Sequence, residues 1–118
     1  MGADLVRSLL IAILVPLFGA TPTAAGPFED AAAAYVAGDH AKAAQLFRPL
    51  AEEGDARAQN NLGIMYTNGD GVPRDYSEAV KWFRRSAEQG DASAQTSLGS
   101  MYFAGRGVNQ DYGEAATW

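Results

Sequence analysis

The stretch GDARAQNNLGIMYTNGDGVPRDYSEAVKW, residues 54–82, returns 36 residues later as GDASAQTSLGSMYFAGRGVNQDYGEAATW, residues 90–118, with 17 of the 29 aligned positions identical. Self-similarity at a period of about 20 to 50 residues is the signature of a repeat architecture. A degenerate earlier copy precedes these two and has a loop that is five residues shorter. The sequence therefore predicts a degenerate repeat at residues 26–53, a full repeat at 54–89 and a truncated repeat at 90–118.

Each repeat predicts a pair of helices. Asp55 stands where an N-cap is expected, apolar residues follow at helical spacing, and Gly69 supplies the C-terminal stop. Asp75 and Glu78 have the spacing of a capping box for the second helix. The pattern predicts an all-α fold with helices at 28–37, 40–53, 56–67, 76–89, 92–103 and 112–118. Pro49 lies inside the second of these helices, where it predicts a kink or an early break.

The repeated motifs are A-x-A-Q-x-x-L-G-x-M-Y, the loop G-x-G-V-x-x-D and the helix start E-A-x-x-W. Together they resemble the Sel1-like repeat family, a short-period relative of the tetratricopeptide repeat. The resemblance is strong over residues 54–118 and weak over residues 26–53, which look like a tetratricopeptide-like or capping repeat. It implies a right-handed α-solenoid of about two and a half helix-turn-helix repeats. It also implies a scaffold for protein complexes, since exported bacterial members are often adaptors or regulators.

The two copies of the first helix differ only on one side. Residues in a helix are about 100° apart, so the differing positions fall within an arc of about 120°, and the identical positions occupy the other side. In this family the first helices line the concave surface, so we expect a protein or peptide partner on the varying side. The candidate binding residues are Arg57, Asn60, Asn61, Ile64 and Asn68, followed by Ser93, Thr96, Ser97, Ser100 and Phe103. The alternative is that these positions are solvated and bind nothing.

The candidate residues suit a peptide. Asn side chains can donate to and accept from an extended backbone, and Arg57 can pair with a carboxylate. The identical side carries the bulk of the expected core, including Leu62, Tyr66 and Trp82. Gly63 in mid-helix costs about 1 kcal/mol relative to Ala, which predicts a close contact that needs its missing side chain.

The composition excludes most catalytic and metal chemistry within this chain. It has no cysteine and one histidine, and its 9 basic and 14 acidic residues give a net charge of -5. These counts exclude a disulfide scaffold, a thiol nucleophile and a cysteine-based zinc site. The acidic net charge also gives no excess of basic residues that would bind the phosphates of a nucleic acid. The second copy has Ala104 and Arg106 in place of Asn68 and Asp70, so this loop keeps its glycines and loses its oxygens. We therefore expect no metal, no cofactor and no enzyme activity. We also expect His40 to be exposed and to have no catalytic role, because it has no partner nearby.

Residues 1–25 predict a secretory signal peptide. Arg7 precedes an apolar run at residues 9–18, and a segment of small residues leads to an expected cleavage site after Ala25. The expected location is periplasmic or secreted, with no stable membrane insertion after cleavage. The alternative is an uncleaved anchor, although the apolar run is short for about 30 Å of hydrocarbon.

Two functional hypotheses remain open. The first is a non-enzymatic scaffold or adaptor in the bacterial envelope that binds a peptide or partner protein on its concave face. The second treats the repeats as the N-terminal portion of a longer envelope enzyme or regulator, because the last expected helix stops at Trp118, two turns short of its counterpart. Since solenoids usually need about three repeats, we also expect the chain to form a homodimer or to depend on further repeats.

Overall fold

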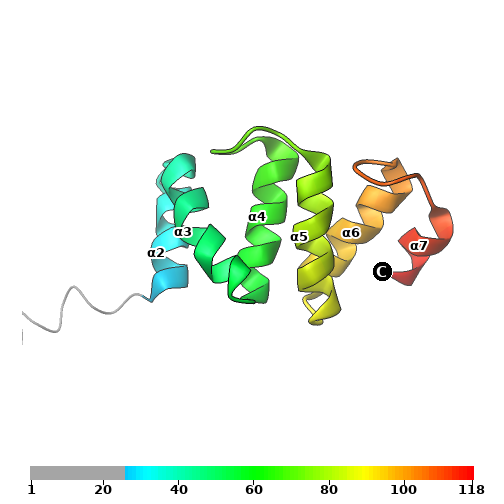
Figure 1. Ribbon diagram of the computed structural model, residues 1–118, viewed down its shortest axis with the longest axis horizontal. Coiled ribbons are helices and arrows are strands. Elements are labelled where there is room, and N and C mark those ends of the chain that lie inside the picture. The colour runs from blue at the N-terminus through cyan, green and yellow to red at the C-terminus, as the bar shows by residue number, and fades with distance from the viewer. Residues whose placement is uncertain (1–25) are drawn as a thin grey trace, which may run out of the picture.

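The structure, a computed structural model, describes residues 26–118, and this part of the chain holds six α-helices and no strand (Figure 1). The helices are α2 Pro27–Val36, α3 His40–Glu52, α4 Ala56–Asn68, α5 Tyr76–Glu88, α6 Ala92–Ala104 and α7 Tyr112–Thr117. The all-α prediction is confirmed, and every helix begins and ends within one residue of its expected range. The expected signal peptide lies outside the described residues. Among residues 26–118, no helix has the length and hydrophobicity that crossing a membrane requires.

Aspartate begins five of the helices and glycine ends two of them. The carboxylates of Asp39, Asp55, Asp75, Asp91 and Asp111 each accept a hydrogen bond from a backbone N–H in the first turn that follows. These bonds satisfy donors that a helix start leaves without an intrahelical partner. Gly69 and Gly105 close α4 and α6 in the left-handed conformation, with φ values of 73° and 65°. The helix boundaries therefore follow from local chemistry that repeats every 36 residues.

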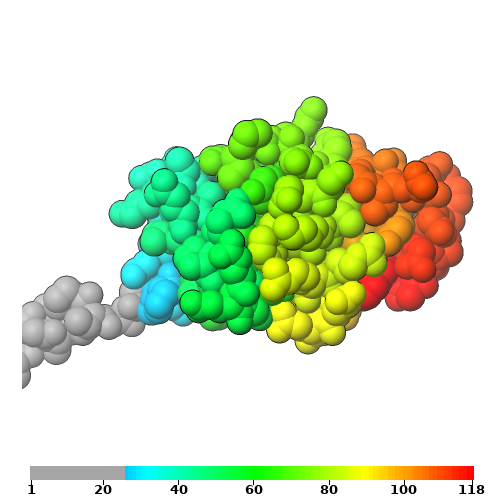
Figure 2. All heavy atoms as spheres, viewed as in Figure 1, coloured from blue at the N-terminus to red at the C-terminus, as the bar shows by residue number. Residues whose placement is uncertain are grey.

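The helices stack in chain order. Each one packs mainly against the helix before it and the helix after it, so the array is nearly one-dimensional. Figure 2 shows the same order in the packed atoms, because the colours pass from blue to red along the molecule without mixing. The core is made of large side chains such as Trp82, Phe47 and Phe83, together with closely packed alanines. A Cβ atom at Gly63 would lie 2.5 Å from the Phe83 ring, which confirms the expected close contact.

Of the two outcomes predicted for Pro49, the early break is wrong, because α3 continues through this residue to Glu52, and the kink stays a prediction. Pro49 lacks the N–H that would bond to the carbonyl of Gln45, but both residues are exposed and water can solvate that carbonyl. The carbonyl of Pro49 accepts from the backbone N–H of Glu53 at 3.0 Å, so the last turn closes normally.

The two long loops reach back to the preceding repeat (Figure 1). Gly71, in the loop between α4 and α5, lies against the backbone of His40 at the start of α3. Gly107, in the loop between α6 and α7, lies against the backbone of Tyr76 at the start of α5. Both glycines have a φ of 71°. Each loop therefore links one repeat to the repeat before it.

Candidate partner-binding face

The ten candidate residues lie on α4 and α6, on the side away from the core. We call the side formed by the outward positions of α2, α4 and α6 the first-helix face. On α4 the buried residues are Ala58, Gln59, Leu62, Gly63, Met65 and Tyr66, all of which are identical in the next copy. The differing positions of α4 are exposed or half-buried. The division between a packing side and a varying side, inferred from the sequence, is therefore present in the structure.

Two small hollows lie on the first-helix face, one between each pair of neighbouring first helices. The α2/α4 hollow, of about 260 Å³, is lined by Ala32, Tyr35, Val36, Phe47, Asn61 and Ile64. The α4/α6 hollow, of about 240 Å³, is lined by Ile64, Thr67, Asn68, Phe83, Thr96, Ser97, Ser100, Met101 and Arg106. Ile64 belongs to both hollows. Both hollows are smaller than typical small-molecule sites, which have volumes of roughly 300 to 1,000 Å³. Each hollow could hold a single side chain.

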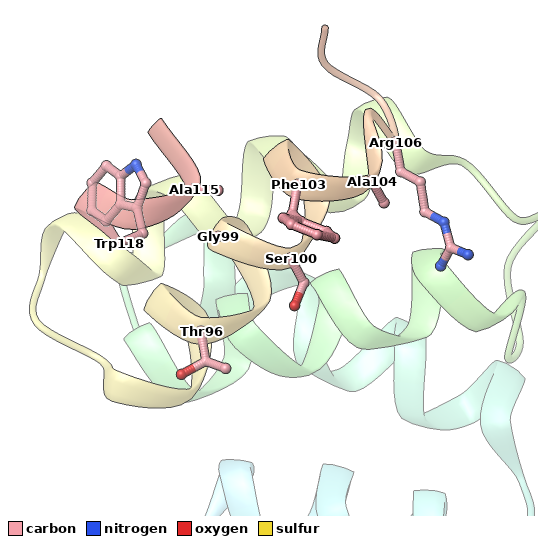
Figure 3. Close-up of a pocket in the computed structure, with 8 residues that line it drawn as sticks. All are labelled: Thr96, Gly99, Ser100, Phe103, Ala104, Arg106, Ala115 and Trp118. Carbon is pink, nitrogen blue, oxygen red and sulfur yellow. The ribbon is translucent and has the colours of Figure 1, made fainter. Parts of the chain in front are cut away.

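A third and wider hollow of about 570 Å³ lies beyond α6 (Figure 3). Thr96, Ser100 and Phe103 follow one another along one side of α6, and Arg106 lies past the end of this row (Figure 3). Gly99, Ala115 and Trp118 form the other part of the wall. Phe103 is 61% exposed and packs its ring 5.2 Å from the ring of Tyr112. Candidate residues thus line all three hollows on this face.

Three of the ten candidates do not line these hollows. The guanidinium of Arg57 lies 3.2 Å from the carboxylate of Asp55 and 4.0 Å from the centroid of the Phe28 ring, so local contacts occupy it. Burial alone would raise the pKa of Asp55. Hydrogen bonds from the Arg57 side chain and the Ala58 backbone lower it by more than burial raises it, so the pKa lies below its usual value. The Oδ1 atom of Asn60 is buried without a hydrogen-bond donor among the described residues. Ser93 is exposed.

The structure adds residues to the face that the sequence comparison missed. Tyr35 and Val36 bring α2 into the α2/α4 hollow, and Val36 is 87% exposed. Arg106 lines both the α4/α6 hollow and the third hollow. The sequence signal for Arg106 was present, since a cation replaces Asp70 in the second copy.

The expectation that His40 has no partner is wrong. Its Nδ1 lies 3.7 Å from Oδ1 of Asp70, and its ring stacks on Tyr35 with 4.6 Å between the centroids. The hydroxyl of Tyr35 donates to Oδ2 of Asp70 at 3.1 Å. Burial raises the pKa of Tyr35, and the hydrogen bond to Asp70 and the charge of its carboxylate raise it further. The fold-back of the loop creates this contact, so a search along single helices could not detect it.

Polar contacts on the other side of the array also repeat. Arg48 donates to the hydroxyl of Tyr66, and Arg84 donates to the hydroxyl of Tyr102, 36 residues later. These arginines therefore link helices and are not a free basic patch. Among residues 26–118, no group of three or more histidine, aspartate or glutamate side chains could hold a metal ion.

Comparison with known proteins gives one family and several solved structures. The model of the Sel1 repeat matches residues 32–55, 56–91 and 92–118. A protective antigen present in uropathogenic Escherichia coli strains, which displays an SLR fold, is 42% identical with a TM-score of 0.66, over 75% of this chain and 21% of that chain. A Sel1 repeat protein from Oxalobacter formigenes is 31% identical with a TM-score of 0.74, over 80% of this chain and 38% of that chain. No curated protein matches the chain. The chain thus spans about a fifth and about two fifths of the lengths of these two solved proteins.

Proposed function

Because the chain belongs to the Sel1 repeat family, we propose that it is a non-enzymatic adaptor that binds an extended segment of a partner protein on its first-helix face. Sel1 repeats are protein-interaction modules, and the family is typically a repeat scaffold without catalytic activity. The proposal adds to this the face that binds and the form of the bound segment.

The observation that carries the proposal is the pair of hollows that share Ile64. In an extended peptide, successive side chains point to opposite sides, so every second side chain can enter a hollow of the surface on which the peptide lies. Two neighbouring hollows of single-side-chain size suit such a peptide better than they suit one compact ligand. The α2/α4 hollow is largely apolar, with Val36, Phe47 and Ile64 in its lining, and would hold an apolar side chain.

The polar groups on this face suit a peptide backbone. Asn61 and Asn68 have both donors and acceptors, and Ser97 and Ser100 have hydroxyls that can do either. An extended peptide presents N–H and C=O groups along its length, and these must find partners when water is displaced. The varying positions of α4 and α6 would supply such partners.

The envelope role and the periplasmic or secreted location are part of the same proposal. They rest on the sequence of residues 1–25, with its apolar run and small-residue exit. Fractionation of the source cells with a mass measurement of the chain tests them, because cleavage after Ala25 removes a defined mass. The proposals of a homodimer and of a longer envelope enzyme or regulator remain open.

An array of immobilised peptides of random sequence tests the binding face. We expect the purified chain to bind a subset of peptides, and the double variant Asn61→Ala/Ser100→Ala to lose about thirtyfold in affinity, since each of its two lost hydrogen bonds costs about 1 kcal/mol. The matched control is Ser77→Ala/Gln45→Ala, which removes exposed polar groups from the second helices. Equal loss in both double variants would contradict the assignment of the face.

A further inference from the structure

We propose that the segment bound on the first-helix face carries an acidic side chain, aspartate or glutamate, which pairs with Arg106 beside the α4/α6 hollow. This inference rests on the proposed function and makes it more specific, because it names the chemistry of the ligand. It predicts an acidic residue near an apolar residue in the bound segment.

The charges around the hollows support an acidic ligand. Among the side chains that line the two hollows between first helices and the third hollow, the one charged group is the guanidinium of Arg106, and no aspartate or glutamate is present. The whole chain has a net charge of -5, so Arg106 is a positive charge on a molecule that is negative overall. An approaching acidic segment is therefore repelled by much of the surface and attracted at the hollows, which favours this position over others.

Arg106 is available for such a pair. Within residues 26–118 it forms no ion pair, and its guanidinium lies over the Tyr76 ring at 5.5 Å from the centroid. Stacking on an aromatic ring positions the guanidinium while leaving its donors free for a carboxylate. Arg57, the one arginine among the ten candidates, is already held by Asp55.

The position of Arg106 indicates an acidic side chain and not a chain terminus. Arg106 lines the α4/α6 hollow on one side and the third hollow on the other. The bound segment can therefore continue past the cation in both directions. The hydroxyl of Ser100, which lines the same two hollows, can donate to a carboxylate oxygen that the guanidinium leaves free.

The preceding repeat provides an internal comparison. Asp70 occupies the position equivalent to Arg106, between glycines of nearly the same conformation: Gly69 and Gly71 have φ values of 73° and 71°, and Gly105 and Gly107 have 65° and 71°. The Asp70 carboxylate already accepts a hydrogen bond from Tyr35 and lies 3.7 Å from Nδ1 of His40. At this position, only the second loop thus offers a free charge to a ligand. The comparison also shows that this loop conformation accepts an aspartate, so Arg106→Asp is a charge reversal that the backbone tolerates.

The test uses an array of immobilised peptides with amidated C-termini, in which an apolar residue is followed by Asp or Glu, and a matched array with Asn or Gln instead. We expect the chain to bind the acidic array about fivefold more tightly, as about 1 kcal/mol from a partly exposed ion pair gives. Arg106→Gln should remove this preference, and Arg106→Asp should reverse it toward peptides that carry Lys or Arg.

The matched control is Lys42→Gln, which removes one positive charge from an exposed residue outside the three hollows and should keep the acidic preference. Thermal unfolding of each variant checks that the array is intact. Equal binding to the acidic and amide arrays, or a preference that persists in Arg106→Gln, would overturn this inference and leave the proposed function in place. A preference found only for peptides with a free C-terminal carboxylate would also overturn it. Absence of binding to every peptide would remove the proposed function as well.

Discussion

Gly71 lies so close to the backbone of His40 that a Cβ atom at Gly71 would overlap the carbonyl group of His40, and Gly107 stands in the same relation to Tyr76, 36 residues later. This contact joins the loop of one repeat to the second helix of the repeat before it. Neighbouring repeats stabilise each other in a solenoid, so such contacts contribute to the interface energy on which the array depends.

The first prediction concerns this contact. Gly71→Ala should destabilise the chain by about 2 to 4 kcal/mol, because it combines a positive φ with a backbone overlap. Gly90→Ala is the matched control, since Gly90 has a φ of 96° but no atom within 4 Å of its Cβ position. It should cost only about 1 kcal/mol. Urea denaturation of both variants measures the difference, and equal losses would show that the overlap relaxes freely.

The second prediction concerns Gly63. Replacing glycine by alanine in mid-helix normally stabilises by about 1 kcal/mol. Here the new methyl group would lie 2.5 Å from the Phe83 ring, so Gly63→Ala should instead destabilise by about 1 to 3 kcal/mol. Adding Phe83→Leu should make the Gly63→Ala change less costly, because the smaller side chain frees space. A double-mutant cycle by thermal unfolding measures this coupling, and purely additive effects would argue against the contact.

The third prediction concerns Trp82, which is 2% exposed. Trp82→Ala should cost about 3 to 5 kcal/mol, as expected when a large buried aromatic side chain leaves a cavity. Trp82→Phe should cost clearly less, because its Nε1 atom has no hydrogen-bond partner among the described residues and no bond is lost. Denaturant titration followed by circular dichroism tests both variants. A Trp82→Phe variant as unstable as Trp82→Ala would contradict this ranking.

The fourth prediction is a dependence of stability on alkaline pH. The folded chain holds the Tyr35 pKa above the usual value of 10.0, so folding favours the neutral phenol. The stabilisation is complete below about pH 10 and is lost as the pH rises through the raised pKa. The Tyr35→Phe variant lacks this group and should lose less stability between about pH 8 and about pH 11. Urea denaturation across this range measures the slope, and equal slopes for the two proteins would contradict the prediction.

The sequence predicted those features that depend on residues within one repeat. Capping aspartates such as Asp55 and terminal glycines such as Gly69 act within a few residues, so the helix boundaries could be read from their spacing. The buried side of α4 could also be predicted, because packing had kept the same residues in both copies. The early break predicted at Pro49 is wrong because the cost of this proline depends on whether the freed carbonyl of Gln45 meets water, and exposure is a property of the folded array.

Contacts between repeats could not be predicted in this way. The pairing of His40 with Asp70 requires the loop to fold back across α3, and no spacing along a helix encodes that path. The place of Arg106 beside the α4/α6 hollow depends on the same fold-back. The two loop glycines, Gly71 and Gly107, were the available signal, since both are kept where a backbone approach is close. Their distant partners became evident only in three dimensions.

The most direct test of the account is photo-crosslinking from the two sides of the array in the source cells. A benzophenone amino acid would replace Asn61 or Ser100 on the first-helix face, or Gln45 or Ser77 on the second helices. We predict that the first two positions give one and the same discrete adduct, and that the other two give none. Adducts that form equally from both sides, or from the second helices alone, would contradict the central claim that the first-helix face binds the partner.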